Sequence, residues 1–425
     1  MVYGPQMWMM HNLQYRSYRK TEIYDKIQVV LAYQQFGESR HDRKFQDSLL
    51  HHRNEKVHAF TFNLDFEKSL TKKIDLFYGF EAVYNNVVST ANGENIFTAE
   101  QSVISTRYPG IYNHYFTTGI FANFKYKLRS NLTAMAGLRY SRVYSDSKFD
   151  NTINQLPYDQ LTMNLGAPNA SVGLAWLPGN KWQINFNIAS AFRAPNIDDA
   201  AKVFDSEPGN VVVPNPDLQP EYAYSAEVGI NKDIKEIAHI ELNVFYTYVD
   251  QVIVRRDFQF NGKDSIIYDG TMSKVQAMVN AQSAQIYGAT AALRLKINEY
   301  FDFETTYSLM HGQDDEGYNL RHIPPSFGSS SIHFKHLKYK AQLFANYNGG
   351  IAFEDLAPSE QDKTNMYTPD GAEAWYTLNF RASVTVSLIT FNLGVDNILD
   401  RFYMPYSSGI PAAGRNFYIS FHLHY

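Results

Sequence analysis

The sequence has no cysteine, so it can form neither a disulfide framework nor a thiolate metal site. It contains no apolar run that approaches ~18 residues, which excludes a transmembrane helix. Charged residues make up only 19% of the chain. The net charge is −5, so the chain has no excess of basic residues with which to bind nucleic acid. No Gly-x-Ser-x-Gly elbow and no His-x-x-x-His spacing occurs either. The sequence therefore carries no enzyme motif, and we expect no catalytic residue, no cofactor and no metal site.

The N-terminal stretch Met1 to Lys20 also lacks the features of a signal peptide. It has no basic n-region and no apolar stretch of the usual length, only the short cluster Met7 to Met10. A protein of the bacterial outer membrane needs such a signal. If the chain is one, the sequence predicts that it begins inside a longer protein.

What the sequence does have is aromatic residues, at 15%, and strict alternation. At the C-terminus, apolar side chains occupy every second position: Phe417, Ile419, Phe421, Leu423 and Tyr425. Alternation of this kind predicts a β-strand with one apolar and one polar face. A soluble sandwich could end in such a strand. A closed outer-membrane barrel needs one there, because the last strand must pair with the first and turn its apolar face to lipid.

The same pattern recurs along the chain, most clearly from Tyr376 to Leu388. Crossing an apolar band ~25 Å tall at ~40° tilt and ~3.4 Å per residue takes roughly 9–10 residues, which these segments supply. The pattern predicts that alternate side chains face lipid and lumen. The residues expected to face lipid are Phe62, Trp182, Tyr376, Phe380, Val384, Phe417 and Phe421. Those expected to face the lumen are Asn63, Asn185, Asn379, Arg381 and Thr385.

Connections between these segments alternate in length. Short turns are expected at 68–73, 128–131, 178–181, 297–300 and 388–390. Long loops are expected at 37–51, 89–113, 145–167, 193–220, 252–271, 312–325, 350–372 and 399–413. Short turns at one end and long loops at the other are the outer-membrane pattern. The sequence thus predicts an all-β, membrane-spanning antiparallel barrel wall of about 17 strands.

Four stretches resemble motifs of the TonB-dependent receptors. They are AFRAPN at Ala191–Asn196, NPDLQPE at Asn215–Glu221, RHIPPSFG at Arg321–Gly328 and VDNILDRFY at Val395–Tyr403. The family barrel has 22 strands around a plugged lumen. If the last strand here corresponds to the twenty-second of the family, the first strand here corresponds to the sixth. Even-numbered strands of the family run toward the periplasm, and the alternating loop lengths give the first strand here the same direction. The resemblance therefore implies that residues 1–425 are a partial barrel domain that lacks the plug, the signal peptide and the first five strands.

Candidate ligand-binding residues are the loop residues Arg40, Arg43, Arg193, Asp198 and Asp199. Arginine could meet an anionic ligand or lipid phosphate, although a charged surface loop explains Arg40 and Arg43 as simply. The Phe-Arg-Ala-Pro and Asn-Pro steps favour a structural role, because proline rigidifies a strand exit. In haem-transporting relatives the loop between these motifs carries a ligand histidine, and Asn196 to Pro214 has none.

The resemblance implies energy-coupled uptake of a scarce nutrient: a ferric siderophore, cobalamin, haem or an oligosaccharide. Expected partners are outer-membrane lipid, that nutrient, a surface lipoprotein, and the TonB complex acting through the plug. Alternatives of other classes are a passive porin-like channel, a barrel lipid hydrolase and a soluble β-solenoid. The paired motifs are not expected in a porin-like channel. The absence of a Gly-x-Ser-x-Gly elbow disfavours a lipid hydrolase, and the absence of a short repeat disfavours a β-solenoid.

Overall fold

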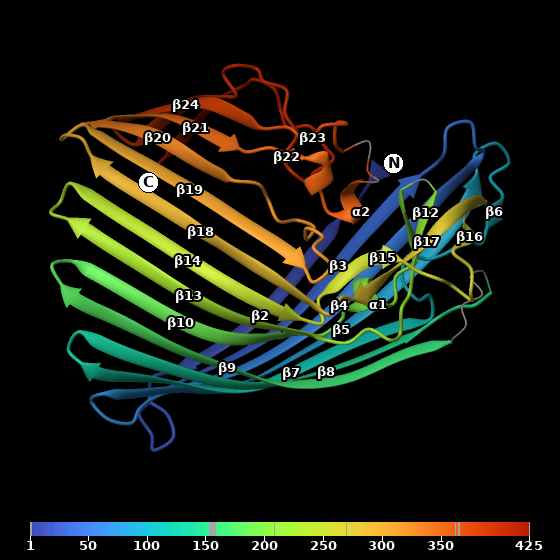
Figure 1. Ribbon diagram of the computed structural model, residues 1–425, viewed down its shortest axis with the longest axis horizontal. Coiled ribbons are helices and arrows are strands. Elements are labelled where there is room, and N and C mark those ends of the chain that lie inside the picture. The colour runs from blue at the N-terminus through green and yellow to red at the C-terminus, as the bar shows by residue number, and fades with distance from the viewer. Residues whose placement is uncertain are drawn as a thin grey trace.

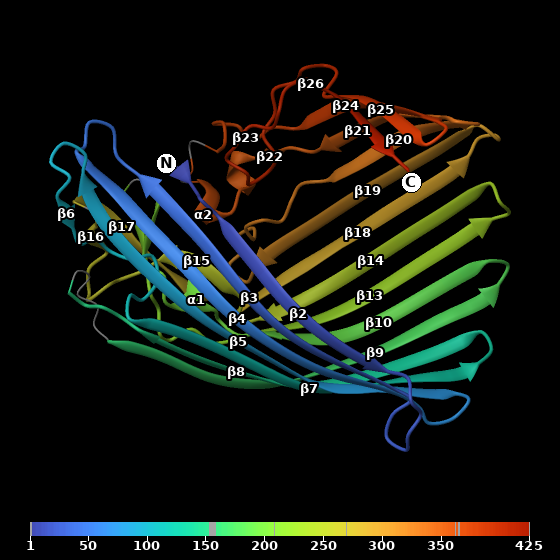
Figure 2. The same cartoon turned by 180° about the vertical axis from the view of Figure 1, so that it is seen from behind.

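The computed structural model describes residues 2–152, 159–207, 209–268, 270–361, 363 and 366–424. Its dominant feature is one long, curved antiparallel sheet that wraps around a central space (Figures 1 and 2). Helices are limited to α1 (Ile197–Ala200), α2 (Pro358–Gln361) and one 3-10 turn, η1 (Phe353–Asp355), within these residues. None of the described helices is long and apolar enough to cross a membrane.

The large sheet contains 19 strands, of which two are only two residues long. The other seventeen pair in chain order from β2 to β26, each antiparallel to the next. The strands are β1 (Val2–Tyr3), β2 (Met7–Ser17), β3 (Lys26–Asp42), β4 (Leu49–Ser69), β5 (Ile74–Asn95), β6 (Gln101–Ser102), β7 (Tyr112–Arg129), β8 (Leu132–Lys148), β9 (Gln160–Gly179), β10 (Trp182–Arg193), β13 (Glu221–Ile234), β14 (Ala238–Asp250), β18 (Ser283–Lys296), β19 (Phe301–Asp314), β20 (Phe327–His336), β21 (Tyr339–Asn348), β24 (Trp375–Val386), β25 (Ile389–Asp396) and β26 (Asn416–Leu423).

The predicted all-β wall of about seventeen strands is therefore confirmed. Phe417, Ile419, Phe421 and Leu423 lie in β26, which pairs with β25; Tyr425 lies outside the described residues. In the described part of the chain, no pairing joins β26 to β2. The first of the seventeen long strands, β2, begins at Met7. In the sequence, this region stood out only by the short apolar cluster from Met7 to Met10.

Short turns gather at one end of the wall, here called the turn end, and longer connections at the other, the loop end (Figure 1). Several predicted loops turn out to be largely strand. Of residues 37–51, only 43–48 lie outside β3 and β4, and β5 runs for 22 residues. The prediction was wrong here because these extensions are polar on both faces. The backbones of β3, β4 and β5 remain hydrogen-bonded in these extensions, although apolar and polar side chains no longer alternate there.

A second sheet of five short strands lies at the loop end (Figure 1). It consists of β11 (Phe204–Glu207), β12 (Asn210–Val213), β15 (Ile253–Asp257), β16 (Ser265–Tyr268) and β17 (Thr271–Asn280). β12 and β17 are parallel, and Val211 and Val275, which are opposite each other, are fully buried. A two-stranded piece, β22 (Ile351–Ala352) with β23 (Gly371–Ala372), belongs to another loop. We call the five-stranded unit the small sheet.

The two faces of the large sheet differ as the alternation predicted. In β24, Tyr376 is 50% exposed on one face, whereas Thr377 and Asn379 on the other are almost fully buried beneath the loop end. Phe417 and Phe421 are 70% and 74% exposed. Such a display of large apolar side chains is expected where hydrocarbon and not water is the solvent.

Candidate functional site

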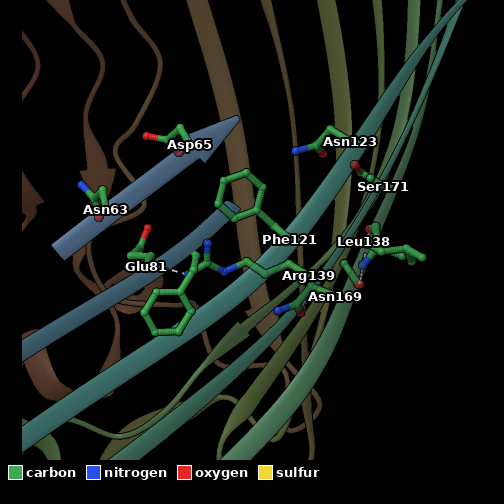
Figure 3. A pocket seen from close by; sticks show the side chains of 13 residues that line it. Asn63, Asp65, Glu81, Phe121, Asn123, Leu138, Arg139, Asn169 and Ser171 are labelled. Atoms are coloured by element: carbon green, nitrogen blue, oxygen red, sulfur yellow. Dashed lines mark hydrogen bonds and ion pairs between the residues drawn. The ribbon is translucent and has the colours of Figure 1, made fainter. Parts of the chain in front are cut away.

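The inner face of the wall carries a polar pocket of about 360 Å³ across β4, β5 and β7–β9 (Figure 3). Arg139 lies at its centre and donates from Nη2 to Glu81 Oε1 at 2.9 Å and from Nε to Ser141 Oγ at 2.9 Å. Its guanidinium carbon sits 6.0 Å from the ring centroid of Phe121. The Arg139–Glu81 pair is about one-third exposed, so it remains within reach of a solute in the lumen.

Two glycines make room for this arrangement. A Cβ at Gly119 would lie 2.3 Å from Arg139 Nη2, and one at Gly137 would lie 2.3 Å from Asn123 Oδ1. Neither contact can exist between real atoms, so any larger residue would push Arg139 or Asn123 out of place. Glycine at both positions lets long polar side chains lie flat along the wall.

The pocket also contains amide oxygens that have no partner. Within the described residues, Asn63 Oδ1 and Asn169 Oδ1 are buried and accept no hydrogen bond. A buried acceptor left unsatisfied costs about 1–3 kcal/mol. The wall of the pocket therefore holds two acceptors whose cost the described contacts do not offset.

Arg193, at the loop end of β10, is held between two carboxylates. It donates from Nη2 to Asp199 Oδ2 at 2.7 Å and from Nη1 to Glu221 Oε2 at 2.8 Å. Glu221 Oε1 in turn accepts the backbone N–H of Ile253 at 2.6 Å. The arginine of the first motif thus clamps the glutamate of the second to α1, and its donors are used internally.

The rest of the two motifs is structural in the same way. Asn196 caps α1, accepting the Asp199 N–H at 3.0 Å, while the Asp199 carboxylate accepts the Asn196 N–H. Asp198 projects outward, where it accepts from Tyr108 Oη at 2.9 Å and pairs with Lys202 at 3.0 Å. Burial, reinforced by Asp198, raises the pKa of Tyr108 above its usual range, which keeps this phenol a donor.

The two loop arginines lie apart from Arg193. Arg40 is in β3 and pairs with Glu38 at 2.6 Å, with its guanidinium 5.3 Å from the Tyr3 ring centroid. Arg43 donates to the backbone carbonyl of Asp47 within the β3–β4 connection. The structure does not bring Arg40, Arg43, Arg193, Asp198 and Asp199 into one pocket. Whether any of them binds a ligand stays a prediction.

The small sheet is tied to segments that come from widely separated parts of the wall. Lys44 donates to Thr271 Oγ1 at 3.2 Å, and the hydroxyls of Ser105 and Tyr268 are 3.4 Å apart. From β15, Arg255 donates to the Ser359 carbonyl at 2.7 Å, and Arg256 pairs with Asp314. The sheet therefore spans the mouth of the lumen between the β3–β7 side and the β19–β24 side.

A fully buried glutamate that was not among the predicted site residues holds two further loops together. Glu360 of α2 accepts from Tyr367 Oη at 2.9 Å, Tyr406 Oη at 2.8 Å and Ser407 Oγ at 2.8 Å. Arg321 lies 3.8 Å away. Burial and the nearby carboxylate raise the pKa of both tyrosines above the usual range, so both stay protonated and keep donating. Its partners are 7 to 47 residues distant, and no spacing rule in the sequence identifies them.

No group of three or more His, Asp or Glu side chains in the described ranges is arranged to hold a metal ion. What the geometry defines is a membrane wall with an apolar exterior, a polar lumen and a structured mouth, which is the class of outer-membrane transport barrels. A family model described as "TonB dependent receptor-like, beta-barrel" matches residues 6–398. The chain belongs to the TonB-dependent receptor β-barrel family and resides in the outer membrane, with the loop end outside.

Solved structures show the same fold at low sequence identity. The copper transporter OprC superposes with a TM-score of 0.79 at 12% identity, covering 97% of this chain. The ferric yersiniabactin uptake receptor FyuA from Yersinia pestis superposes with a TM-score of 0.69 at 15% identity and covers 98% of this chain. The ferric citrate transporter FecA superposes with a TM-score of 0.70 at 13% identity and covers 97% of this chain. This chain spans 67%, 61% and 61% of their respective lengths. No curated protein matches it in sequence.

Proposed function

We propose that this chain forms most of the lumen wall and the extracellular mouth of a receptor that takes up a scarce nutrient with energy from TonB. Family membership makes it part of a transport protein. The observation that carries the finer proposal is the polar inner wall, where Arg139 and Glu81 pair beside unsatisfied amide acceptors. Such a surface binds polar occupants weakly and at many points, as a conducting path requires.

The cargo is a solute too large for porins: a ferric siderophore, cobalamin, haem or an oligosaccharide. Copper, ferric yersiniabactin and ferric citrate are what the structural neighbours carry, and they widen the panel to be tested. Haem is the least favoured, because the loop between the two motifs has no histidine between Asn196 and Pro214. The protein acts as a transporter and not as an enzyme, and a surface lipoprotein is a candidate partner at the mouth.

We propose further that additional strands complete the barrel, since β2 and β26 each leave one edge unpaired within the described chain. A plug in the lumen would supply the segment on which TonB pulls. An open edge in hydrocarbon costs several kcal/mol for each unsatisfied backbone group, which favours completion.

The test is nutrient uptake in a receptor-deficient strain that expresses this chain with a signal peptide, together with a plug and the missing strands. Saturable uptake of one solute in the panel, abolished by a protonophore, supports the proposal. The Arg139→Ala variant should lower that uptake severalfold, whereas Arg142→Ala, in the same strand but on the outer face, is the matched control and should leave uptake unchanged. Uptake that the protonophore leaves unchanged would instead indicate a passive channel.

A further inference from the structure

The outer face of β2–β8 carries an ordered set of side chains near its loop end. Strand register places one aromatic row directly across six strands: His11, Tyr33, Phe60, Tyr84, Phe116 and Tyr144. The Tyr33 and Phe60 ring centroids are 4.9 Å apart, and those of Phe60 and Tyr84 are 6.4 Å apart. Aromatic side chains gather where hydrocarbon meets headgroups, and because the strands tilt by ~40°, only neighbouring members of this row lie at a similar depth.

One row below, toward the turn end, the surface is hollow. The register there runs through Leu13, Leu31, Phe62, Ala82 and Thr118, and it ends on β8 at Arg142, whose Nε donates to Asn164 Oδ1 at 3.0 Å. Ala82 and Thr118 are small, so an apolar groove of about 570 Å³ opens between Leu31, Phe62 and the aromatic row. It faces the side where hydrocarbon lies, and Leu13 at its edge is 68% exposed.

One row above the aromatics, two histidines are fixed by tyrosines of the aromatic row. Tyr33 Oη is 2.9 Å from His58 Nδ1, and Tyr84 Oη is 2.7 Å from His114 Nδ1. When the tyrosine donates, the imidazole proton resides on Nε2, which makes that nitrogen a donor directed away from the tyrosine. Histidines held in this way offer two N–H groups to an acceptor near the aromatic row.

The next row adds positive charge. Lys56 lies opposite Val88, and Lys148 opposite Tyr112; both lysines are exposed. The acid in this region is Asp146, beside His114, and it already accepts from Gln160 Nε2 at 2.6 Å and Thr162 Oγ1 at 3.2 Å. Above the groove, the surface therefore presents N–H donors and ammonium groups, the chemistry that binds phosphate.

We propose that this surface is a binding site for the phosphorylated glycolipid of the outer leaflet, lipid A, distinct from the transport path in the lumen. An acyl chain occupies the groove between Leu31, Phe62 and Ala82. A glucosamine phosphate rests against Lys56, His58 and His114. The order along β4 decides the leaflet: Phe62 lines the groove, and Phe60, His58 and Lys56 follow toward the loop end, which fits a lipid whose headgroup faces that end.

The test uses this chain together with the strands that complete the barrel, reconstituted in phosphatidylcholine nanodiscs that contain a few lipid A molecules each, followed by native mass spectrometry of the lipid retained. Ala82→Phe fills the groove and should lower retained lipid A at least fivefold. Ala289→Phe is the matched control, since Ala289 faces lipid between Val244 and Leu309 on β18, far from the groove. Lys56→Glu should also lower retention, and Lys56→Arg should preserve it.

Heat-modifiable migration on gels verifies that each variant is folded, and Lys56→Glu keeps the test decisive if Ala82→Phe fails to fold. Equal retention by Ala82→Phe and Ala289→Phe, or by Lys56→Glu and the parent, would overturn the site. Displacement of lipid A by an equal amount of phosphatidylglycerol would overturn the assignment to the glycolipid, because an ordinary phospholipid would then be the occupant.

Discussion

At the residue scale, the face on which a side chain lies determines what a substitution costs. Val384 and Thr385 are neighbours in β24, but the first faces outward and the second faces the lumen, where its hydroxyl lies 3.0 Å from Thr390 Oγ1. Val384 lies two residues before the end of β24, so Val384→Arg should lower the free energy of unfolding by about 1–2 kcal/mol, between the midplane and interface costs. Thr385→Arg should cost much less, because the guanidinium remains in water. Urea unfolding in lipid vesicles measures both, and equal costs would contradict the face assignment.

Also at this scale, the Glu360 cluster predicts a response to alkaline pH. The folded-state pKa of Tyr367 and of Tyr406 is raised above the ordinary value of 10.0, so the folded protein holds these protons longer than the unfolded chain. Their contribution to stability is complete below pH 10 and is lost as pH rises through the raised values. Ultraviolet titration of tyrosinate should show a late-ionising fraction that shrinks in the double variant Tyr367→Phe, Tyr406→Phe. An unchanged titration curve would show that these phenols are not the protected ones.

Among the candidate residues, those within a sequence motif could be assigned a role from the sequence. A structural role was favoured for Arg193 because its motif bounds a strand and a loop, and the structure gives it two carboxylate partners. Glu360 and Arg139 were not identified, because each depends on partners brought together only by the fold. For Arg139 a signal did exist: it is a charged residue in an alternating strand, with glycines in the same strand and its neighbour at Gly137 and Gly119.

At the element scale, strands were predictable wherever one face meets lipid and the other meets water. Alternation located segments in β3, β4, β5, β7, β10, β14, β24 and β26, and the alternating loop lengths indicated the strands between them. It did not predict the small sheet, whose strands are four to ten residues long and whose parallel pair β12–β17 joins residues more than sixty positions apart. Short, fully buried strands carry no alternation, and long-range pairing has no local sequence signal.

The small sheet should behave as a separate unit of stability. Val275→Ala removes buried apolar contact opposite Val211 and should destabilise the small sheet by roughly 2 kcal/mol. Hydrogen exchange should then accelerate in β12, β15 and β17 while the membrane strands keep their protection. Val244→Ala, at an exposed site on the outer face, is the control and should leave the small sheet unchanged. Acceleration spread evenly over both sheets would mean that they unfold together.

At the scale of the whole molecule, the number and direction of the strands followed from the alternating loop lengths. The loop lengths did not predict the polar strand extensions or the small sheet across the mouth, because neither changes the alternation of short and long connections. The transport proposal depends on parts that this chain does not supply among its described residues. Expressed without a plug and the remaining strands, the chain should give no saturable, protonophore-sensitive uptake of any solute in the panel. Such uptake by this chain alone would refute the proposal that further strands complete it.

The central claim is that one curved wall separates lipid outside from a polar lumen inside. The most direct measurement is a nitroxide scan of β24, one spin label at a time from Tyr376 to Val386, with the protein in lipid vesicles. Collision with oxygen, which is enriched in hydrocarbon, should peak at Tyr376, Leu378, Phe380, Ala382, Val384 and Val386. Collision with a water-soluble nickel chelate should peak at Arg381, Ser383 and Thr385, whereas Thr377 and Asn379, which are buried beneath the loop end, should respond to neither reagent. Absence of this two-residue period, or its reversed phase, would contradict the account.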